Sequence, residues 1–80
     1  MVKKISNEQI LKDLEITQRE RFAYRNISEG FERLYLIHEK DGGAYPKFCR
    51  SEHIKYHEKY NECNRLIEEL IRIKTERGLQ

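Results

Sequence analysis

The sequence contains few of the residue types that folds other than helical bundles require. Its 80 residues include no tryptophan, one proline and four glycines. Two cysteines are too few for a disulfide framework, so Cys49 and Cys63 are expected to be free thiols in a reducing compartment. No apolar run follows the first residues or reaches the length of a membrane span, which argues against a signal peptide and a transmembrane helix. We therefore expect a cytoplasmic protein with no membrane partner.

Neither sign of charge dominates the chain. Sixteen Lys and Arg stand against 14 Asp and Glu, a net charge of +2, and there is no basic arm or acidic tail. Any electrostatic site must therefore be created by folding. Charged and apolar residues each make up 38% of the chain, a balance typical of amphipathic helices. The abundance of Lys, Ile, Glu and Asn hints at a bacterial or phage origin.

A short first helix is predicted over residues 7–15. Ser6 and Gln9 have the spacing of a capping box, in which each side chain bonds the other residue's amide. Ile5 and Ile10 flank this box as a hydrophobic staple. These signals predict that the helix begins directly after Ser6.

A second helix is predicted over residues 18–40. Thr17 and Glu20 have the spacing of another capping box, and the β-branched Ile16 and Thr17 favour a bend before it. Apolar and aromatic residues then recur at steps of three and four on one face: Tyr24, Ile27, Phe31, Leu34 and His38. Two glycines after residue 40 are expected to end the helix.

The third helix, over residues 51–76, is the best defined. A single face carries Tyr56, Tyr60, Cys63, Ile67 and Leu70. Ser51 is its expected N-cap, and residues 41–50, which contain Pro46, are expected to form the loop before it. The sequence thus predicts one all-α domain over residues 1–80.

In this domain a short N-terminal helix precedes a long antiparallel helical hairpin. A ten-residue loop would bring His38 near His53 and Arg21 near Leu70. The last helix also carries more apolar surface than one neighbouring helix can cover, through Leu66, Ile67, Leu70, Ile71 and Ile73. Phe22 and Leu36 point away from the predicted face of the middle helix.

We therefore expect self-association into a dimer or higher oligomer, as an assembled helical bundle or coiled coil. The alternative is a three-helix monomer in which the first helix covers these apolar side chains.

Aromatic and basic residues mix around the predicted loop, at Tyr45, Lys47, Phe48, Arg50 and, on the next helix, Tyr56. Loops on rigid scaffolds often carry recognition, so these five residues are the predicted contact surface for a partner protein. The favoured function is a non-enzymatic regulatory or inhibitory binding protein that occludes a site on its partner.

Two alternatives remain open. The hairpin would gather Arg19, Arg21, Arg25, Arg72 and Lys74 at one end, where they could sequester a phosphorylated small molecule, nucleotide or nucleic acid. The competing interpretation of these charges is a solvated face with ion pairs between successive turns. A helix-turn-helix around Leu14–Thr17 is not favoured, because the following apolar positions do not match a recognition helix.

The second alternative is a metal-binding module that takes zinc as its cofactor. His53 and His57 have the i, i+4 spacing of a chelating pair, and Cys49 and His38 could add ligands. Ile54 stands where a zinc protease has glutamate, so the pair does not indicate a hydrolase. No catalytic residue is predicted, and Cys63, on the apolar face, is expected to be a buried core residue.

Overall fold

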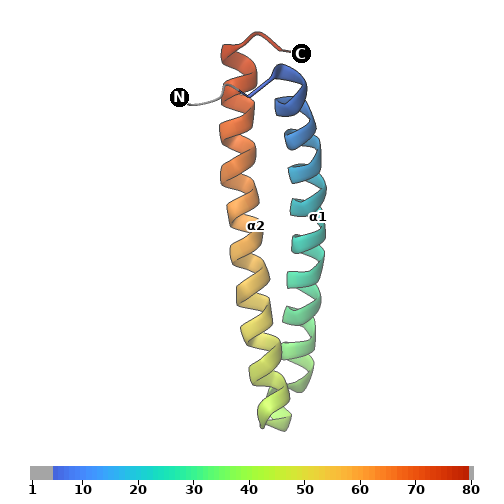
Figure 1. Cartoon of the computed structure of the whole chain (residues 1–80). Helices are drawn as coiled ribbons and strands as arrows, with labels where there is room; N and C mark the ends of the chain where they lie inside the picture. Colours follow the sequence, from blue (N-terminus) through green and yellow to red (C-terminus); the bar gives the residue numbers. More distant parts are fainter. Residues whose placement is uncertain (1–4, 80) are drawn as a thin grey trace.

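The computed structural model describes residues 5–79, which form two long antiparallel helices joined by a tight turn (Figure 1). Helix α1 spans Asn7–His38, the 3-10 turn η1 spans Glu39–Asp41, and helix α2 spans Ala44–Glu76. The described ends of the chain lie at the same end of the hairpin. The predicted all-α hairpin is confirmed, whereas the separate short N-terminal helix is wrong.

Helix α1 begins at the cap that the sequence predicts. The Oγ of Ser6 accepts a hydrogen bond from the amide of Gln9 at 3.1 Å. The Gln9 side chain donates to Asp13 at 2.6 Å instead of reaching back to Ser6, so only half of the capping box forms. Because Glu8 lies in the first turn, its charge also favours a helix start here.

Helix α1 passes through Thr17 without the predicted bend, so the first two predicted helices are one. The Oγ1 of Thr17 donates to the carbonyl oxygen of Asp13 at 2.7 Å, and the side chain is buried. The hydroxyl is thus satisfied inside the helix. Burial against α2 outweighs the weak helix propensity of the β-branched pair Ile16–Thr17.

The turn is shorter than predicted, because α2 begins at Ala44 rather than at Ser51. Gly42 and Gly43 have φ values of 67° and 82°, a region that favours glycine. Pro46 lies in the first turn of α2, where helix amides have no intrahelical acceptor and a missing N–H costs nothing. The predicted loop residues from Ala44 onward are therefore helical.

The shorter turn also changes which residues meet across the hairpin. His38, predicted near His53, packs against Tyr45 with ring centroids 5.1 Å apart, and His53 bonds Ser28 instead. The predicted pairing assumed a ten-residue loop. A turn at Gly42–Gly43 shifts α2 by about two helical turns relative to that prediction.

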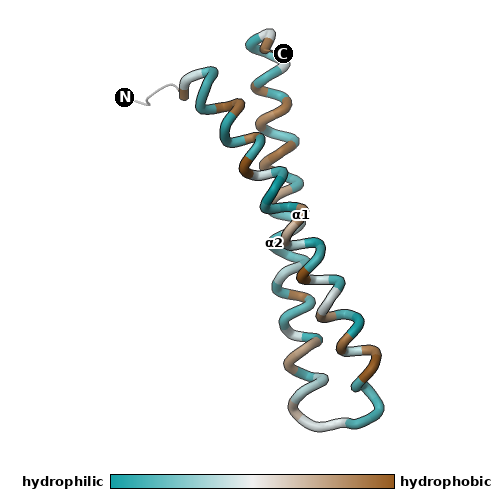
Figure 2. The backbone as a smooth tube through the Cα atoms, turned by 90° about the vertical axis from the view of Figure 1, so that its right-hand side faces the viewer, coloured by the Kyte–Doolittle hydropathy of each residue, from teal (hydrophilic) through white to brown (hydrophobic). Residues whose placement is uncertain are grey.

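The interface between the helices follows a heptad pattern, with buried or half-buried residues at alternating steps of four and three. Helix α1 contributes Ile10, Leu14, Thr17, Arg21, Tyr24, Ser28, Phe31, Tyr35 and His38. Helix α2 contributes Pro46, Cys49, His53, Tyr56, Tyr60, Cys63, Ile67 and Leu70. We call these residues the seam. Their period is that of a coiled coil, and Figure 2 shows the helices crossing near the middle of the hairpin.

The hairpin is a single layer of two helices. It measures 54 × 27 × 15 Å, and its radius of gyration is 17.4 Å, against about 12 Å for a compact domain of this length. Its accessible surface of 6400 Å² exceeds the roughly 5200 Å² expected for a compact protein of this mass. Both broad faces are thus open in the isolated chain. No helix in residues 5–79 has the length and apolar character needed to cross a membrane.

Candidate functional site: a groove along the seam

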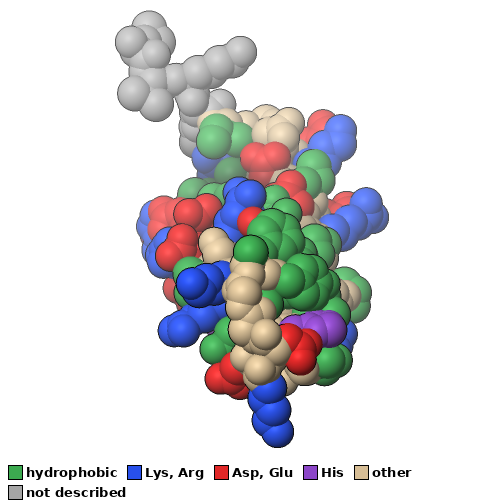
Figure 3. Space-filling model, turned by 90° about the horizontal axis from the view of Figure 1, so that it is seen from below, with side chains coloured by type: hydrophobic (Ala, Val, Ile, Leu, Met, Phe, Trp, Pro, Cys, Tyr) green, Lys and Arg blue, Asp and Glu red, His purple; other side chains and the backbone are tan. Residues whose placement is uncertain are grey.

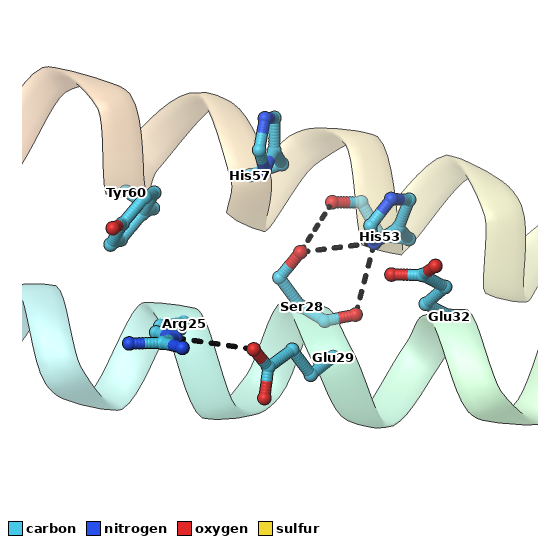
Figure 4. Close-up of a pocket in the computed structure, with 7 residues that line it drawn as sticks. All are labelled: Arg25, Ser28, Glu29, Glu32, His53, His57 and Tyr60. Atoms are coloured by element: carbon cyan, nitrogen blue, oxygen red, sulfur yellow. Dashed lines mark hydrogen bonds and ion pairs between the residues drawn. The ribbon is translucent and has the colours of Figure 1, made fainter.

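One broad face of the hairpin is hollowed along the seam. The central hollow has a volume of about 400 Å³ and is lined by Arg25, Ser28, Glu29, Glu32, His53, His57 and Tyr60 (Figure 4). A second hollow of about 400 Å³, towards the turn, is lined by Glu32, Tyr35, Leu36, Arg50, His53 and Ile54. A third of about 240 Å³, towards the termini, is lined by Arg21, Phe22, Arg25 and Tyr60. Because neighbouring hollows share lining residues, they form one continuous depression, which we call the groove.

The centre of the groove is held by a hydrogen-bonded pair, Ser28 and His53. The Oγ of Ser28 lies 3.0 Å from Nδ1 of His53 and donates to the His53 carbonyl oxygen at 3.3 Å. Nδ1 also lies 3.0 Å from the Ser28 carbonyl oxygen, which accepts when Nδ1 carries the proton. The other ring nitrogen points away from α1 (Figure 4). A satisfied polar pair inside a heptad seam selects one alignment of the helices.

Residues of both charges surround this pair. Arg25 donates to Glu29 at 3.1 Å, and the Glu32 carboxylate rises from α1 towards α2 beside His53 (Figure 4). Towards the turn, the Arg50 guanidinium lies 5.9 Å from the centre of the Tyr35 ring, within cation–π range. The groove therefore offers hydrogen-bonding groups, both charge signs and aromatic surface to a ligand.

The predicted metal set is not brought together. His53 and His57 are neighbours, with ring centroids 5.9 Å apart, but His38 lies at the turn, 3.1 Å from Asp41. Cys49 is completely buried in the seam. Within residues 5–79, no three His, Cys, Asp or Glu side chains are placed to hold a metal ion.

The predicted partner-binding residues divide between different surroundings. Tyr56 stacks on Phe31 at 6.0 Å, and Phe48 meets the same ring edge-on at 6.1 Å, so both join an interhelical aromatic cluster. Arg50 lines the groove, Tyr45 packs on His38, and Lys47 is exposed. Seen from the turn end, hydrophobic side chains reach the surface beside a histidine (Figure 3).

Most of the predicted basic cluster is engaged in ion pairs within its own helix. Arg19 pairs with Glu15 and Arg25 with Glu29, and Arg72 pairs with both Glu69 and Glu76. Two further members differ: Arg21 donates to Asn64 at 3.3 Å, six residues before its predicted neighbour on α2, and Lys74 is half-buried.

These pairs alter the acid–base properties of their members. The hydrogen bond from Arg72 holds the pKa of Glu69 below its ordinary value, and the bonds to Glu69 and Glu76 raise the pKa of Arg72. This end of the hairpin is therefore the solvated, ion-paired face that was the competing interpretation. Sequestration of an anionic ligand there stays a prediction.

Both cysteines belong to the seam. Cys63 is buried as predicted, and burial raises the pKa of its thiol, which favours the protonated, less reactive form. Cys49 is a free thiol with no exposed surface.

Ser28 is the central groove residue among those that sequence reasoning missed. The predicted face ran through Ile27 and Leu34, whereas the seam runs through Ser28 and Tyr35. The missed signal is the alternation of four and three that continues from Leu14 through Tyr24 to Phe31, since it requires residue 28 and not 27.

Compared with known protein families, curated proteins and solved structures, the chain shows no significant match.

Proposed function

We propose that this chain is a non-enzymatic helical binding module whose groove accepts a helical or extended segment of a partner protein. The observation that carries the proposal is the continuous groove and its apolar rim. Phe22, Leu36 and Ile54 border it and are about half exposed or more. A groove between two helices with apolar anchors along it suits an amphipathic segment that lies lengthwise.

The charges around the groove favour a partner segment that carries both signs. Arg25 and Arg50 offer cations, and Glu29 and Glu32 offer anions, all at the lining of the hollows. Such groups orient a bound segment and reject mismatched ones more than they add to affinity. Occupation of the groove would cover the bound surface of the partner, which is a regulatory or inhibitory action by occlusion.

The chemistry of the groove supports binding rather than a reaction. Ser28 and His53 lie at the distance of a nucleophile and its base. However, Ser28 is only 4% exposed and its hydroxyl donates to a backbone carbonyl, so a substrate has no access to it. No acid within residues 5–79 hydrogen-bonds to His53 in the orienting role that a catalytic triad requires.

Site-specific photo-crosslinking tests this proposal. A benzophenone amino acid at Ile54, on the groove rim, is expected to form an adduct with a partner protein in cells of the source organism. The same probe at Arg33, an exposed position on the outer edge of α1, is the matched control and is expected to form none. Equal adducts from both positions, or no adduct from Ile54, would contradict a partner-binding groove.

Self-association is the second part of the proposal. The accessible surface exceeds that of a compact protein by roughly 1200 Å², enough for one partner's share of a stable interface. We expect sedimentation at micromolar concentration to show a species at least twice the chain mass of 9.8 kDa. A single 9.8 kDa species would contradict this part and leave the groove proposal standing.

A further inference from the structure

Helix α1 carries a second heptad row outside the seam. Its members again alternate by four and three, and Glu20 is the only charged one: Ile16, Glu20, Ala23, Ile27, Gly30, Leu34 and Ile37. Ile16, Ile27 and Ile37 are exposed, at 48%, 39% and 67%. The spacing of a coiled-coil contact thus recurs where α2 does not reach.

This second row lies on the broad face opposite the groove. A hollow on that side is lined by Glu20 together with Lys59, Glu62 and Leu66 of α2, and it shares no residue with the groove. Ile27 follows Glu20 by one heptad, so it projects from the same side. We call this surface the apolar face.

We propose that the apolar face is covered by the same face of a second copy of this chain, with a two-fold axis crossing α1 at Ile27. The two α1 helices then pack against each other antiparallel. In an isologous contact, each residue meets one equally far beyond the axis. The second row satisfies this condition, because it is nearly symmetric about Ile27.

The symmetry pairs residues of matching size, and it sets Glu20 opposite Leu34 of the partner subunit, because each lies seven residues from Ile27. Ile16 and Ile37 lie eleven and ten residues from Ile27, so Ile16 meets Ile37 of the partner subunit. Ala23 and Gly30 lie four and three residues away, so Ala23 meets Gly30 of the partner subunit. Nothing lies within 4 Å of a Cβ built at Gly30, which leaves that space to the second copy. Small residues oppose small ones near the axis, and isoleucines close both ends of the contact.

Helix α2 fits the same axis. The contacts of Tyr24 with Tyr56, at 6.1 Å, and of Ser28 with His53 place the level of Ile27 at residues 53 and 54 of α2. On the same face of α2, Glu52 and Lys55 lie within two residues on either side of this level. The axis therefore sets Glu52 opposite Lys55 of the partner subunit, and this opposite-charge pair occurs twice in the dimer.

The excess surface of the whole chain is large enough to include a dimer interface. Each chain exposes roughly 1200 Å² more than a compact protein of its mass, and standard interfaces bury about 800 Å² per partner. Face-to-face stacking covers the apolar face and leaves the groove open on the outside. The inference rests on the self-association part of the proposed function and is independent of the groove.

Distances between spin labels test the arrangement. Spin labels are attached to cysteines that replace Arg19, Asn26 or Arg33, one position at a time. These positions lie on the exposed edge of α1, away from both α2 and the apolar face. At a rise of about 1.5 Å per residue, the axial separations between two copies are about 24, 3 and 18 Å. We expect Asn26 to show the shortest distance and Arg19 the longest. The unsubstituted chain, labelled in parallel, reports any signal from the buried Cys49 and Cys63.

Each outcome is decisive. Equal distances at all three positions would mean that the α1 helices run parallel, and would overturn the arrangement while leaving self-association intact. Absence of any distance between copies would overturn the arrangement and self-association together.

Two charge substitutions provide an independent test. We expect Ile27→Glu, at the axis, to weaken the dimer about 100-fold or more, because it faces its own copy across an apolar contact. Phe22→Glu, on the groove side and more exposed at 66%, is the matched control and should change the dissociation constant less than threefold. Both positions are exposed in the monomer, so circular dichroism should show unchanged helix content. The reverse pattern would overturn the proposal.

Discussion

The two ends of the seam contain different types of side chain. At the terminal end, Ile10, Leu14, Ile67 and Leu70 form an aliphatic cluster, with Ile73 and Leu79 packed against it. From the middle to the turn, the seam consists of aromatic rings, cysteines, a proline and the Ser28–His53 pair. Aliphatic burial is strong but non-directional, whereas hydrogen bonds and ring contacts form in only one alignment. We infer that the terminal end supplies most of the stability and that the middle selects the pairing.

The largest expected effect is at the terminal end. Leu70→Ala removes a buried side chain from the aliphatic cluster and should lower the free energy of unfolding by about 2–5 kcal/mol. Urea unfolding followed by circular dichroism measures this change. Its neighbour Ile71 is 45% exposed, so Ile71→Ala should cost much less. Similar losses for the two variants would contradict an aliphatic core at this end.

Substitution in the polar pair in the middle should lower the stability less, and a second substitution should restore most of the loss. Ser28→Ala removes the hydroxyl that bonds His53 and is expected to cost about 1–2 kcal/mol of unfolding free energy. In the double variant Ser28→Ala, His53→Leu, no polar side chain is left unpaired there, so most of the loss should be recovered. A double variant less stable than the single one would show that the pair contributes net stability and not only alignment.

Two glycines, one at the turn and one inside α1, should respond in opposite directions. Gly43→Ala forces a side chain into a backbone with φ of 82° and should cost about 1–2 kcal/mol. Gly30→Ala, inside α1 with no atom within 4 Å of the new Cβ, should stabilise the helix by about 1 kcal/mol. Urea melts of both variants, at a protein concentration where sedimentation shows the monomer, compare them. Stabilisation by Gly43→Ala would mean that the turn has another conformation.

The two cysteines report how often each region opens. Cys49, near the turn, is more deeply buried than Cys63, but it lies farther from the aliphatic cluster. If the turn end opens more readily, Cys49 should react several-fold faster with a thiol reagent than Cys63. The raised pKa of Cys63 slows that thiol further. Single-cysteine variants measured at several reagent concentrations separate opening from chemistry, and faster reaction of Cys63 would reverse the ranking of the two ends.

The smallest effect is expected on the ion-paired surface. Arg72→Gln should leave the urea midpoint unchanged within error, because both of its pairs are exposed to solvent. The pKa of Glu69, which Arg72 lowers, should rise towards its ordinary value in this variant, as NMR titration would show. A lowered folded-state pKa contributes stability above the unfolded-state pKa and loses it as the pH falls through the folded value. A marked change in the midpoint would contradict the solvated character of this face.

The best predictions from the sequence concern α2. Its face from Tyr56 to Leu70 is the seam, because aliphatic and aromatic residues there alternate without interruption. On α1 the predicted face included Ile27 instead of Ser28, because isoleucine is the more hydrophobic of the two. The side chain of Ser28 is short enough for close approach of the helices and finds its partner on His53, and neither property is visible in α1 alone.

The candidate site was only partly predictable for a related reason. His53, His57 and Arg50 were identified by residue type, and all three line the groove. Glu32 and Ser28 reach it only because the turn is short, since a ten-residue loop would have set other residues of α1 against His53. A site between two helices depends on their alignment, to which every residue of the turn contributes.

By itself the sequence determined the helical class, the cap at Ser6, the end of the first long helix at the two glycines and the seam residues of α2 from Tyr56 to Leu70, because these depend on local propensities and periodicity. Only the tertiary structure decided that α1 continues through Thr17, that α2 begins before Pro46, and which residues meet across the seam. These features depend on burial between segments far apart in the chain, where tertiary contacts outweigh local preference. The groove and the apolar face follow from that alignment, and with them the proposals for what each surface binds.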